Sequence, residues 1–517
     1  MTLVIASKKC FVAMMSENET KYSPDYYTNL NDLNKMNFES VTFTVDDVVN
    51  KAGYGKFQIR LLFLSGLGWI ADSCEVFVIS ILSQFLACEW TLKREQPAIL
   101  TYAVFVGMAV GAVCLGTIGD IFGRKKALAT SMVILFVVGF GNAFVPSFLW
   151  MVVCRGILGF GLGGVGQGLA VCTEYCPTHI RGRAAFFLCY FWSFGTILVI
   201  LVSWVVMQYK NSWRLLLMIL CLPSLLGLVS LKWYPESARY YLVSDQYDRA
   251  VKILQKVATT NGTSLPPGHL VQVITEEKRG RFLDLLTKKY RVATLILWYT
   301  WLAVALATYG TVFVSPIIIQ KGFLGTDKND NQTNGNESES AANVVPCLEF
   351  SQQNFIDLLW TSAAEFPGLV IFTFLAEQCG RKVLISVSCF VNGFLLLLLL
   401  IRTHKIVILL VLFAARGLML AVFQLVYIVT LEVYPTTFRA LGMGFGNFFS
   451  KMAGFIVPYV SQVLVFDHPT IAIGLMAGAM FLAAIATAFL PFETRGVQMK
   501  ESAKEKTNCR IDLPQEK

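Results

Sequence analysis

The chain repeats a series of short motifs, in the same order, at a spacing of 256 to 261 residues. Four pairs keep this order: an acid-x-x-Gly-Arg-Lys segment at Asp120 and Glu377, an Arg-Gly pair at Arg155 and Arg416, E-x-x-P-x-x-x-R at Glu174 and Glu432, and a proline-acid segment at Pro235 and Pro491. A preserved order and spacing indicates that each half is a copy of one unit. Two such units facing each other in a membrane can build a site that opens alternately to either side.

Long apolar runs separate these motifs. The chain is 55% hydrophobic and only 15% charged, and about 20 apolar residues are needed to cross a bilayer. The sequence therefore predicts an all-α membrane protein of twelve transmembrane helices in two pseudo-symmetric six-helix bundles. The predicted spans are roughly 57–82, 96–116, 127–145, 148–170, 184–207, 213–231, 293–318, 357–376, 383–401, 406–430, 441–466 and 471–491.

Lysine and arginine decide the orientation of the spans. The short loops of the two sides carry equal numbers, but basic residues flank the first and last spans and fill the central loop, so we expect both tails in the cytosol. The net charge of +9 is then largely an orientation signal and indicates no nucleic-acid partner. The predicted domains are a cytosolic tail at 1–56 with a short amphipathic helix capped by Thr44, a bundle at 57–231, a cytosolic loop with helices at 232–292, a bundle at 293–491 with an outer loop at 319–356, and a cytosolic tail at 492–517.

The outer loop carries two glycosylation sequons, at Asn331 and Asn336. Two cysteines, Cys88 and Cys347, also lie on the predicted outer side. They could form a disulfide between the halves, or they could be two free thiols, because spacing does not establish proximity.

One motif suggests a nucleotide site and is better explained otherwise. Residues 159–164 satisfy G-x-G-x-x-G, but a dinucleotide site needs a strand before it and a soluble sheet around it. Inside an apolar span, small residues at this spacing let two helices approach closely. No catalytic triad, metal-ligand cluster or phosphate loop is evident, so we expect no enzyme activity, no cofactor and no metal.

The repeated motifs resemble a known family. G-x-x-x-D-x-x-G-R-K between spans 2 and 3 resembles the signature loop of the major facilitator superfamily, and R-G-x-x-G-x-G in span 4 resembles its sugar-porter and organic-ion branches. The segments FTVDDVVNKAGYGKFQ (43–58), WIADSCE (69–75) and EVYPTTFRALGMG (432–444) are similar to the synaptic vesicle 2-related, or SVOP-like, branch. The resemblance implies the major facilitator fold, with two six-helix bundles around a central cavity.

The resemblance also implies a cytosolic gate built from the motif residues. Two positions depart from the family pattern, because Ile121 replaces a basic residue and Glu377 replaces an aspartate. The alternative is that these residues are only loop charges that set the topology. The candidates are Asp120, Gly123, Arg124, Glu174, Arg181, Glu377, Arg381, Glu432 and Arg439.

Ionisable residues inside spans are expensive in a membrane and therefore candidates for function. Asp72 and Glu75 lie one turn apart in span 1, and Arg155 of span 4 lies at a similar depth to Glu75. Glu365 of span 8 and Arg416 of span 10 also match in depth, and Lys451 of span 11 has no obvious partner. An acid paired with arginine can be released by protonation, which would couple proton flow to transport. The alternative is that these are static pairs that hold the bundles together.

Aromatic residues of the spans could line the cavity and suit an organic cation or a flat ring, although such residues more often serve packing or anchor a span at the interface. The candidates are Trp69, Phe191, Trp192, Trp301, Tyr309 and Trp360, with Trp192 and Tyr309 favoured because spans 5 and 7 line the cavity in this superfamily.

The sequence therefore predicts a secondary active transporter of a small organic solute, an organic ion rather than a sugar because span 7 lacks the glutamine-rich signature of sugar porters. Proton coupling and alternating access are expected. The alternative is a vesicle-membrane protein that binds a ligand on a transporter fold and no longer transports. The expected partners are a small-molecule substrate, protons and the lipid bilayer of an intracellular vesicle or the plasma membrane, and the chain is expected to be a monomer.

Overall fold

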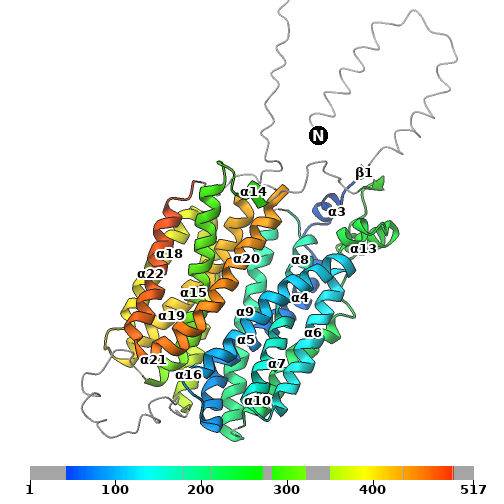
Figure 1. Ribbon diagram of the computed structural model, residues 1–517. Helices are drawn as coiled ribbons and strands as arrows, with labels where there is room; N and C mark the ends of the chain where they lie inside the picture. Colours follow the sequence, from blue (N-terminus) through cyan, green and yellow to red (C-terminus); the bar gives the residue numbers. More distant parts are fainter. Residues whose placement is uncertain are drawn as a thin grey trace, which may run out of the picture.

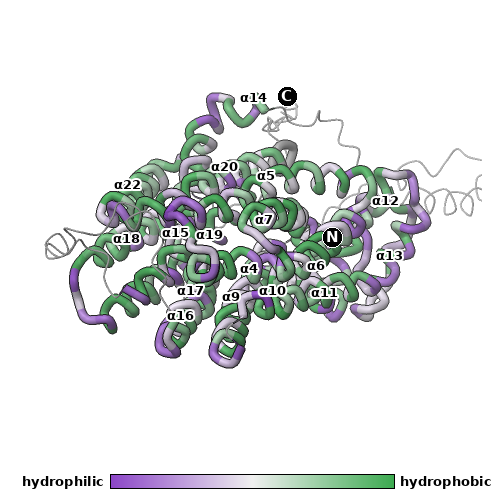
Figure 2. Tube along the Cα trace, turned by 60° about the horizontal axis from the view of Figure 1, so that its bottom comes forward, coloured by the Kyte–Doolittle hydropathy of each residue, from purple (hydrophilic) through white to green (hydrophobic). Residues whose placement is uncertain are grey.

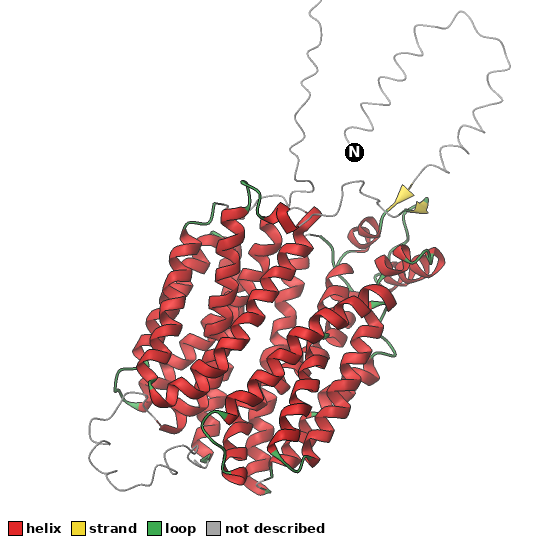
Figure 3. Ribbon diagram, viewed as in Figure 1, coloured by secondary structure: helices red, strands yellow, loops and turns green. Residues whose placement is uncertain are grey.

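The computed structural model describes residues 42–178, 180–210, 212–271, 282–321, 350–434, 436–491 and 493. Twelve helical segments in this part of the chain are long and apolar enough to cross a bilayer. Helices are the expected solution, because hydrocarbon offers no partner for backbone N–H and C=O groups and a helix bonds them all internally. Helices make up almost all of the described structure (Figure 3), which confirms the predicted all-α membrane fold.

The first half of the protein contains spans 1 to 6. Spans 4 and 6 each consist of two helices, and span 3 ends in the short 3-10 helix η2 (Asn142–Phe144). The helices are α4 (Lys56–Trp90), α5 (Gln96–Phe122), α6 (Arg124–Gly141), α7 (Phe148–Gly163), α8 (Gly166–Glu174), α9 (Arg181–Tyr209), α10 (Trp213–Leu220) and α11 (Leu222–Ser230). Span 1 runs further than predicted, to Trp90, because Ser83 and Gln84 are buried among the other helices.

The second half contains spans 7 to 12. Span 8 is interrupted directly before Glu365, and span 11 contains a π-helix at η3. The elements are α15 (Arg291–Lys321), α16 (Gln352–Ala363), α17 (Glu365–Gln378), α18 (Arg381–Leu398), α19 (Lys405–Val433), α20 (Thr436–Tyr459), η3 (Val460–Leu464), α21 (Val465–Asp467) and α22 (Pro469–Ala488).

The repeated glycines explain how helices pack within each half. A Cβ on Gly111 of α5 would lie 2.0 Å from the carbonyl oxygen of Phe160 in α7. In the second half, a Cβ on Gly368 of α17 would lie 2.2 Å from the carbonyl oxygen of Gly417 in α19. Only glycine allows such approaches. The G-x-G-x-x-G segment therefore serves helix packing, as predicted.

A small cap lies on one end of the first half. It consists of β1 (Thr42–Phe43), α3 (Val45–Ala52), α12 (Ala238–Val243), α13 (Tyr247–Thr260) and β2 (His269–Leu270), and β1 pairs with β2 in parallel register (Figure 1). Thr44 caps α3 as predicted, through a capping box with Asp47. The short helix α14 (Phe282–Leu285) lies at the same end of the second half. We call this end cytosolic, following the charge distribution, and the opposite end outer.

The surface of the bundle is apolar between these two ends. Figure 2 shows hydrophobic residues along the helices and hydrophilic residues mainly at their ends and in the cap. Large apolar side chains such as Val113, Leu149 and Phe489 are at least 70% exposed. A surface of this kind is stable against lipid and not against water.

Candidate functional site

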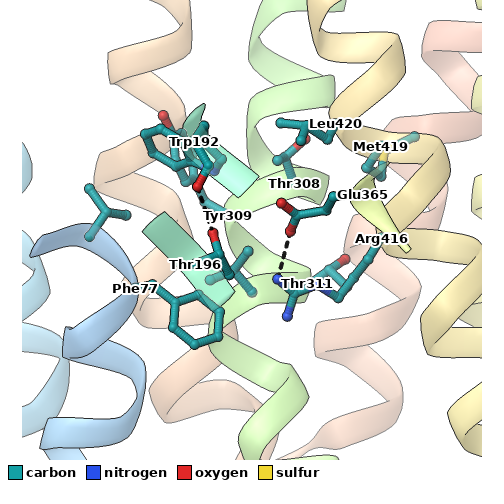
Figure 4. A pocket seen from close by; sticks show the side chains of 12 residues that line it. Phe77, Trp192, Thr196, Thr308, Tyr309, Thr311, Glu365, Arg416, Met419 and Leu420 are labelled. Atoms are coloured by element: carbon teal, nitrogen blue, oxygen red, sulfur yellow. Dashed lines mark hydrogen bonds and ion pairs between the residues drawn. The ribbon is translucent and has the colours of Figure 1, made fainter. Parts of the chain in front are cut away.

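A central cavity lies between the two halves (Figure 4). In this state the cavity is narrow: its volume is about 20 Å³, room for roughly one water molecule, so a solute enters only when the halves move apart. Both halves contribute to its wall: Val76 and Phe77 of α4, Trp192 and Thr196 of α9, Thr308, Tyr309, Thr311 and Val312 of α15, Glu365 of α17, and Arg416, Met419 and Leu420 of α19. A site shared by two pseudo-symmetric bundles can change its access when one bundle moves against the other.

Glu365 and Arg416 form a buried ion pair in this wall. Arg416 Nη2 donates to Glu365 Oε1 at 2.7 Å, and the two side chains are 5% or less exposed. Arg416 Nε and Nη1 and Glu365 Oε2 have no hydrogen-bond partner among the described residues. The ring of Phe77, from the other half, lies 5.3 Å from the Arg416 guanidinium carbon. Glu365 and Arg416, which the sequence predicts to lie at the same depth in the membrane, are therefore in direct contact.

Glu75 and Arg155 form a second buried ion pair, away from the cavity. Arg155 Nη1 donates to Glu75 Oε2 at 2.9 Å, and the pair joins α4 to α7 inside the first half. A Cβ on Gly139 of α6 would lie 3.4 Å from Glu75 Oε1, so the carboxylate faces the interior of its own bundle. Asp72 and Glu75 lie one turn apart, as the sequence indicates, and interact electrostatically. Residues three apart on a helix still differ in direction by about 60°, and only Glu75 pairs with Arg155.

Asp72 faces the other half of the protein. It interacts electrostatically with Lys451 of α20, and Tyr309 and Tyr427 lie within the same electrostatic range. Asp72 Oδ1 has no hydrogen-bond partner among the described residues. Lys451, which has no obvious partner in the sequence, is therefore close enough to Asp72 for an electrostatic interaction, but the two side chains form no ion pair within 4.0 Å.

The predicted aromatic residues divide into three groups. Trp192 and Tyr309 line the cavity. Trp301 is buried inside the second half, where its Nε1 donates to Thr430. Phe191 packs among spans of the first half, and Trp69 packs there and against an apolar cluster between the halves; neither lines the cavity. Trp360 is 66% exposed on the apolar surface, so its prediction as a cavity residue is wrong. An almost uniformly apolar span gives no periodic signal that separates its lipid-facing side from its inner side.

The cytosolic motifs make equivalent contacts within each of the two halves. The backbone N–H of Lys125 donates to Glu236 Oε1 at 3.0 Å, and the backbone N–H of Arg381 donates to Glu493 Oε1 at 2.9 Å. In each half, the acid after the last span therefore caps the start of the third span. Gly123, with φ 108°, is required here, because a Cβ would lie 2.4 Å from Glu236 Oε2.

The candidate gate residues make ion pairs within their own halves. Asp120 pairs with Arg124 at 2.9 Å, and Arg381 pairs with Glu432 at 3.3 Å. Glu174 accepts a hydrogen bond from Ser237. The side chains of Glu377 and Arg439 lie outside the described residues.

Arg181 is held by a residue that the motifs do not contain. Asp46 of α3 accepts hydrogen bonds from Arg181 and from Arg239 of α12. Burial alone would raise the pKa of the Asp46 carboxyl, but the guanidinium groups of Arg239 and Arg181 outweigh it and hold that pKa below its ordinary value. Asn50 of α3 also accepts from the backbone N–H of Thr178 at 3.0 Å. Sequence reasoning missed these partners, because nothing in the motif pattern links the tail to span 5.

Contacts between the halves close the outer end. Arg94 pairs with Asp467 at 2.7 Å, and the Thr101 hydroxyl donates to Gln462 Oε1 at 2.9 Å. Cys88 is disulfide-bonded, and its predicted partner Cys347 lies outside the described residues, as do Asn331 and Asn336. On the cytosolic side of the cavity, an apolar cluster joins the halves through Phe186, Cys189, Leu369 and Leu420.

The fold and its paired cytosolic motifs define a transporter of the major facilitator class, and comparisons agree. Residues 74–334 match the family model of "Sugar (and other) transporter" and residues 349–513 that of the "Major Facilitator Superfamily". A partially occluded inward-open structure of the xylose transporter XylE from E. coli has the same fold, with a TM-score of 0.65 at 18% identity over 86% of this chain and 100% of that one.

Two relatives are similar along most of the chain. The synaptic vesicle 2-related protein of Bos taurus is 36% identical over 89% of this chain and 83% of its own length. The organic cation/carnitine transporter 7 of Arabidopsis thaliana is 31% identical over 89% of this chain and 96% of its own length. The chain is a multi-pass membrane protein that belongs to the synaptic vesicle 2-related family of the major facilitator superfamily.

Proposed function

We propose that this protein is a secondary active transporter that carries a small charged organic solute across a vesicle membrane by alternating access, with the movement coupled to protons. The transporter class is that of its superfamily. A charged solute and a vesicle membrane agree with the names of the two relatives above. The absence of a glutamine-rich signature in Trp298–Gly310 argues against a sugar.

One observation carries the proposal: both halves line the cavity, and charged groups lie in its wall and between the halves. Glu365 and Arg416 form a buried pair in the wall, and half-buried Asp72 of the first half interacts electrostatically with Lys451 of the second half. A charge interaction between two moving bundles differs in strength between the inward-open and outward-open states. Protonation of Asp72 would remove that interaction and let the halves separate, which is the step that proton coupling requires.

The test uses purified protein reconstituted in liposomes that contain a pH-sensitive dye. Binding solutes are first identified by thermal shift from a panel of organic cations, organic anions, zwitterions and hexoses. Each binding solute is then added with and without an imposed pH gradient. We expect at least one charged solute to accumulate only when the gradient is present, and to move the internal pH when it enters.

A specific result would favour the alternative. If solutes bind and stabilise the protein but none enters the liposomes, with or without a gradient, the protein binds ligands without transport. Accumulation that ignores the pH gradient would leave a transporter and remove the proton coupling.

A further inference from the structure

The cavity wall is polar on one side and apolar on the other. In Figure 4 the side chains of Glu365, Arg416, Thr308 and Thr311 lie together, and Phe77 and Trp192 lie across the cavity from them. The two charged groups come from the second half, and apolar lining side chains come from both halves: Val76, Phe77 and Trp192 from the first, and Val312, Met419 and Leu420 from the second. A solute that fits this wall has a polar head group and an apolar or aromatic body.

The polar side has unused hydrogen-bonding groups of both kinds. Arg416 Nε and Nη1 are buried donors, and Glu365 Oε2 is a buried acceptor, and none of the three has a partner among the described residues. The hydroxyls of Thr308 and Thr311 donate their protons to the carbonyl oxygens of Val304 and Ala307, both at 2.7 Å. Their oxygen lone pairs therefore remain free to accept. Half-satisfied buried ion pairs are costly, so a ligand that completes this one gains affinity.

Charge balance restricts the head group. The ion pair is neutral as it stands, and an arginine cannot lose its proton in a protein. A lone cation in the cavity would leave one positive charge buried without compensation, and a lone anion would leave one negative charge. One of the aromatic faces in the wall is also in use, because Phe77 already faces the Arg416 guanidinium.

We propose that the solute is a small zwitterion with an aromatic or apolar body, which rests on the proposed function for its transport but not for its binding. Its carboxylate binds the unused N–H groups of Arg416. Its ammonium group, with three donors, binds Glu365 Oε2 and the hydroxyl oxygens of Thr308 and Thr311. The body packs between Phe77 and Trp192.

The experiment uses four probes that share a phenyl ring and differ in head group: L-phenylalanine, 3-phenylpropionate, 2-phenylethylamine and 2-phenylethanol. Binding to the purified full-length protein is measured by thermal shift and by tryptophan fluorescence. We expect L-phenylalanine to bind about ten- to hundredfold more tightly than the other three, the range that one charge-assisted hydrogen bond contributes.

Two variants reverse the preference and so do not depend on a loss of signal. Glu365→Gln leaves a net positive site, which should prefer 3-phenylpropionate. Arg416→Gln leaves a net negative site, which should prefer 2-phenylethylamine. Glu75→Gln makes the same chemical change in the buried pair of the first half, outside the cavity, and should keep the preference for L-phenylalanine.

The outcomes separate this inference from the proposed function. The inference is overturned if none of the four probes binds, if 2-phenylethylamine or another single-function probe binds best to the parent, or if the two variants fail to exchange preferences. L-Phenylalanine that binds as expected but never enters liposomes supports the site and contradicts transport. Uptake of a different class of solute supports transport and contradicts the zwitterion.

Discussion

Arg155 and Arg416 occupy equivalent positions of the two halves, and each donates a hydrogen bond to a buried glutamate, but the two glutamates belong to non-equivalent spans. Arg155 holds Glu75 of span 1, and Arg416 holds Glu365 of span 8. The arginine therefore recurs at the equivalent position of each half, whereas its glutamate partner comes from a different span. As a result only the second pair lies in the cavity wall, and the two pairs are expected to have different roles.

The pair in the first half is expected to be structural. Arg155→Met leaves Glu75 as an uncompensated buried charge, which should lower the free energy of unfolding by about 3–5 kcal/mol. The double variant Glu75→Leu with Arg155→Met removes both charges and should recover much of that loss. Thermal unfolding in detergent, followed by tryptophan fluorescence, measures both. Equal losses in the single and double variants would contradict the assignment.

Asp72 is expected to be the coupling acid. Asp72→Asn imitates the protonated side chain, so it should keep solute binding and solute exchange but lose accumulation driven by a pH gradient. Lys451→Gln removes the opposing cation and should give the same result, because the charge interaction between the two halves is then absent whether or not Asp72 carries a proton. Uptake into liposomes at two gradients measures the effect. Glu75→Gln is the matched control. If Glu75→Gln loses the gradient dependence and Asp72→Asn keeps it, Asp72 is not the coupling acid.

The outer contacts are expected to hold the outer end closed. Thr101→Val removes a buried hydrogen bond to Gln462, worth about 1 kcal/mol, and should shift the protein toward the outward-open state by roughly fivefold. Arg94→Ala removes a pair that is about 40% exposed and should have a smaller effect. Labelling of Ser83→Cys, at the outer end of span 1, by a membrane-impermeant thiol reagent reports the shift.

A control for this prediction is available in the second half. Lys405 pairs with Asp357 at 2.6 Å within that half, also at the outer end. Lys405→Ala should therefore leave the labelling unchanged. Labelling that rises equally in the control would mean that surface charge, and not closure between the halves, sets the accessibility.

The cap on the cytosolic end is expected to depend on Asp46. Asp46→Asn releases Arg181 and Arg239, so hydrogen exchange of the backbone in α3 should accelerate. The acceleration should be roughly fivefold or less, because the Asp46 side chain is about 40% exposed and ion pairs of this kind contribute about 1 kcal/mol at most. Asp248→Asn on α13, an exposed site in the same cap, is the control.

The pH dependence of the contact between Asp46 and the two arginines follows from the direction in which the pKa of Asp46 is shifted. The pKa of Asp46 is lower in the folded protein than its ordinary value of 3.8. The stabilisation is therefore fully present above the unfolded-state value and is lost as the pH falls through the folded-state value. Exchange in α3 of the parent should approach that of Asp46→Asn only in acid. A difference between the parent and Asp46→Asn that does not shrink as the pH is lowered below 3.8 would contradict this ion pair as the cause.

Glycosylation tests the orientation. Glycosidase treatment should reduce the apparent mass of the protein from cells, and Asn331→Gln with Asn336→Gln should abolish that reduction. Asn261 also lies in a sequon, but its side chain accepts from the backbone N–H of Phe57 at 3.0 Å and donates to Gln58 at 2.7 Å inside the cytosolic cap. Sugar on Asn261 would therefore contradict both the topology and the cap.

The sequence by itself determined the spans, the repeat and the paired cytosolic motifs. Apolar length decides whether a segment crosses a bilayer, and this is a local property that a linear chain displays. The motifs kept their order and spacing in both halves, so the equivalence of Glu236 and Glu493 could be predicted before their matching contacts were seen. The presence of Asp72, Glu75, Glu365 and Arg416 inside apolar spans marked them as candidates.

Only the tertiary structure decided which way these side chains point. Asp72 and Glu75 are one turn apart, yet one faces the other half and one faces Arg155, and Trp360 faces outward although its span lines the cavity with Glu365. Lipid and bundle interior are both apolar, so burial leaves no periodic trace in a transmembrane sequence as it does in a soluble helix. Rotation of each span is set by packing against its neighbours, and that information is distributed over residues far apart in the chain.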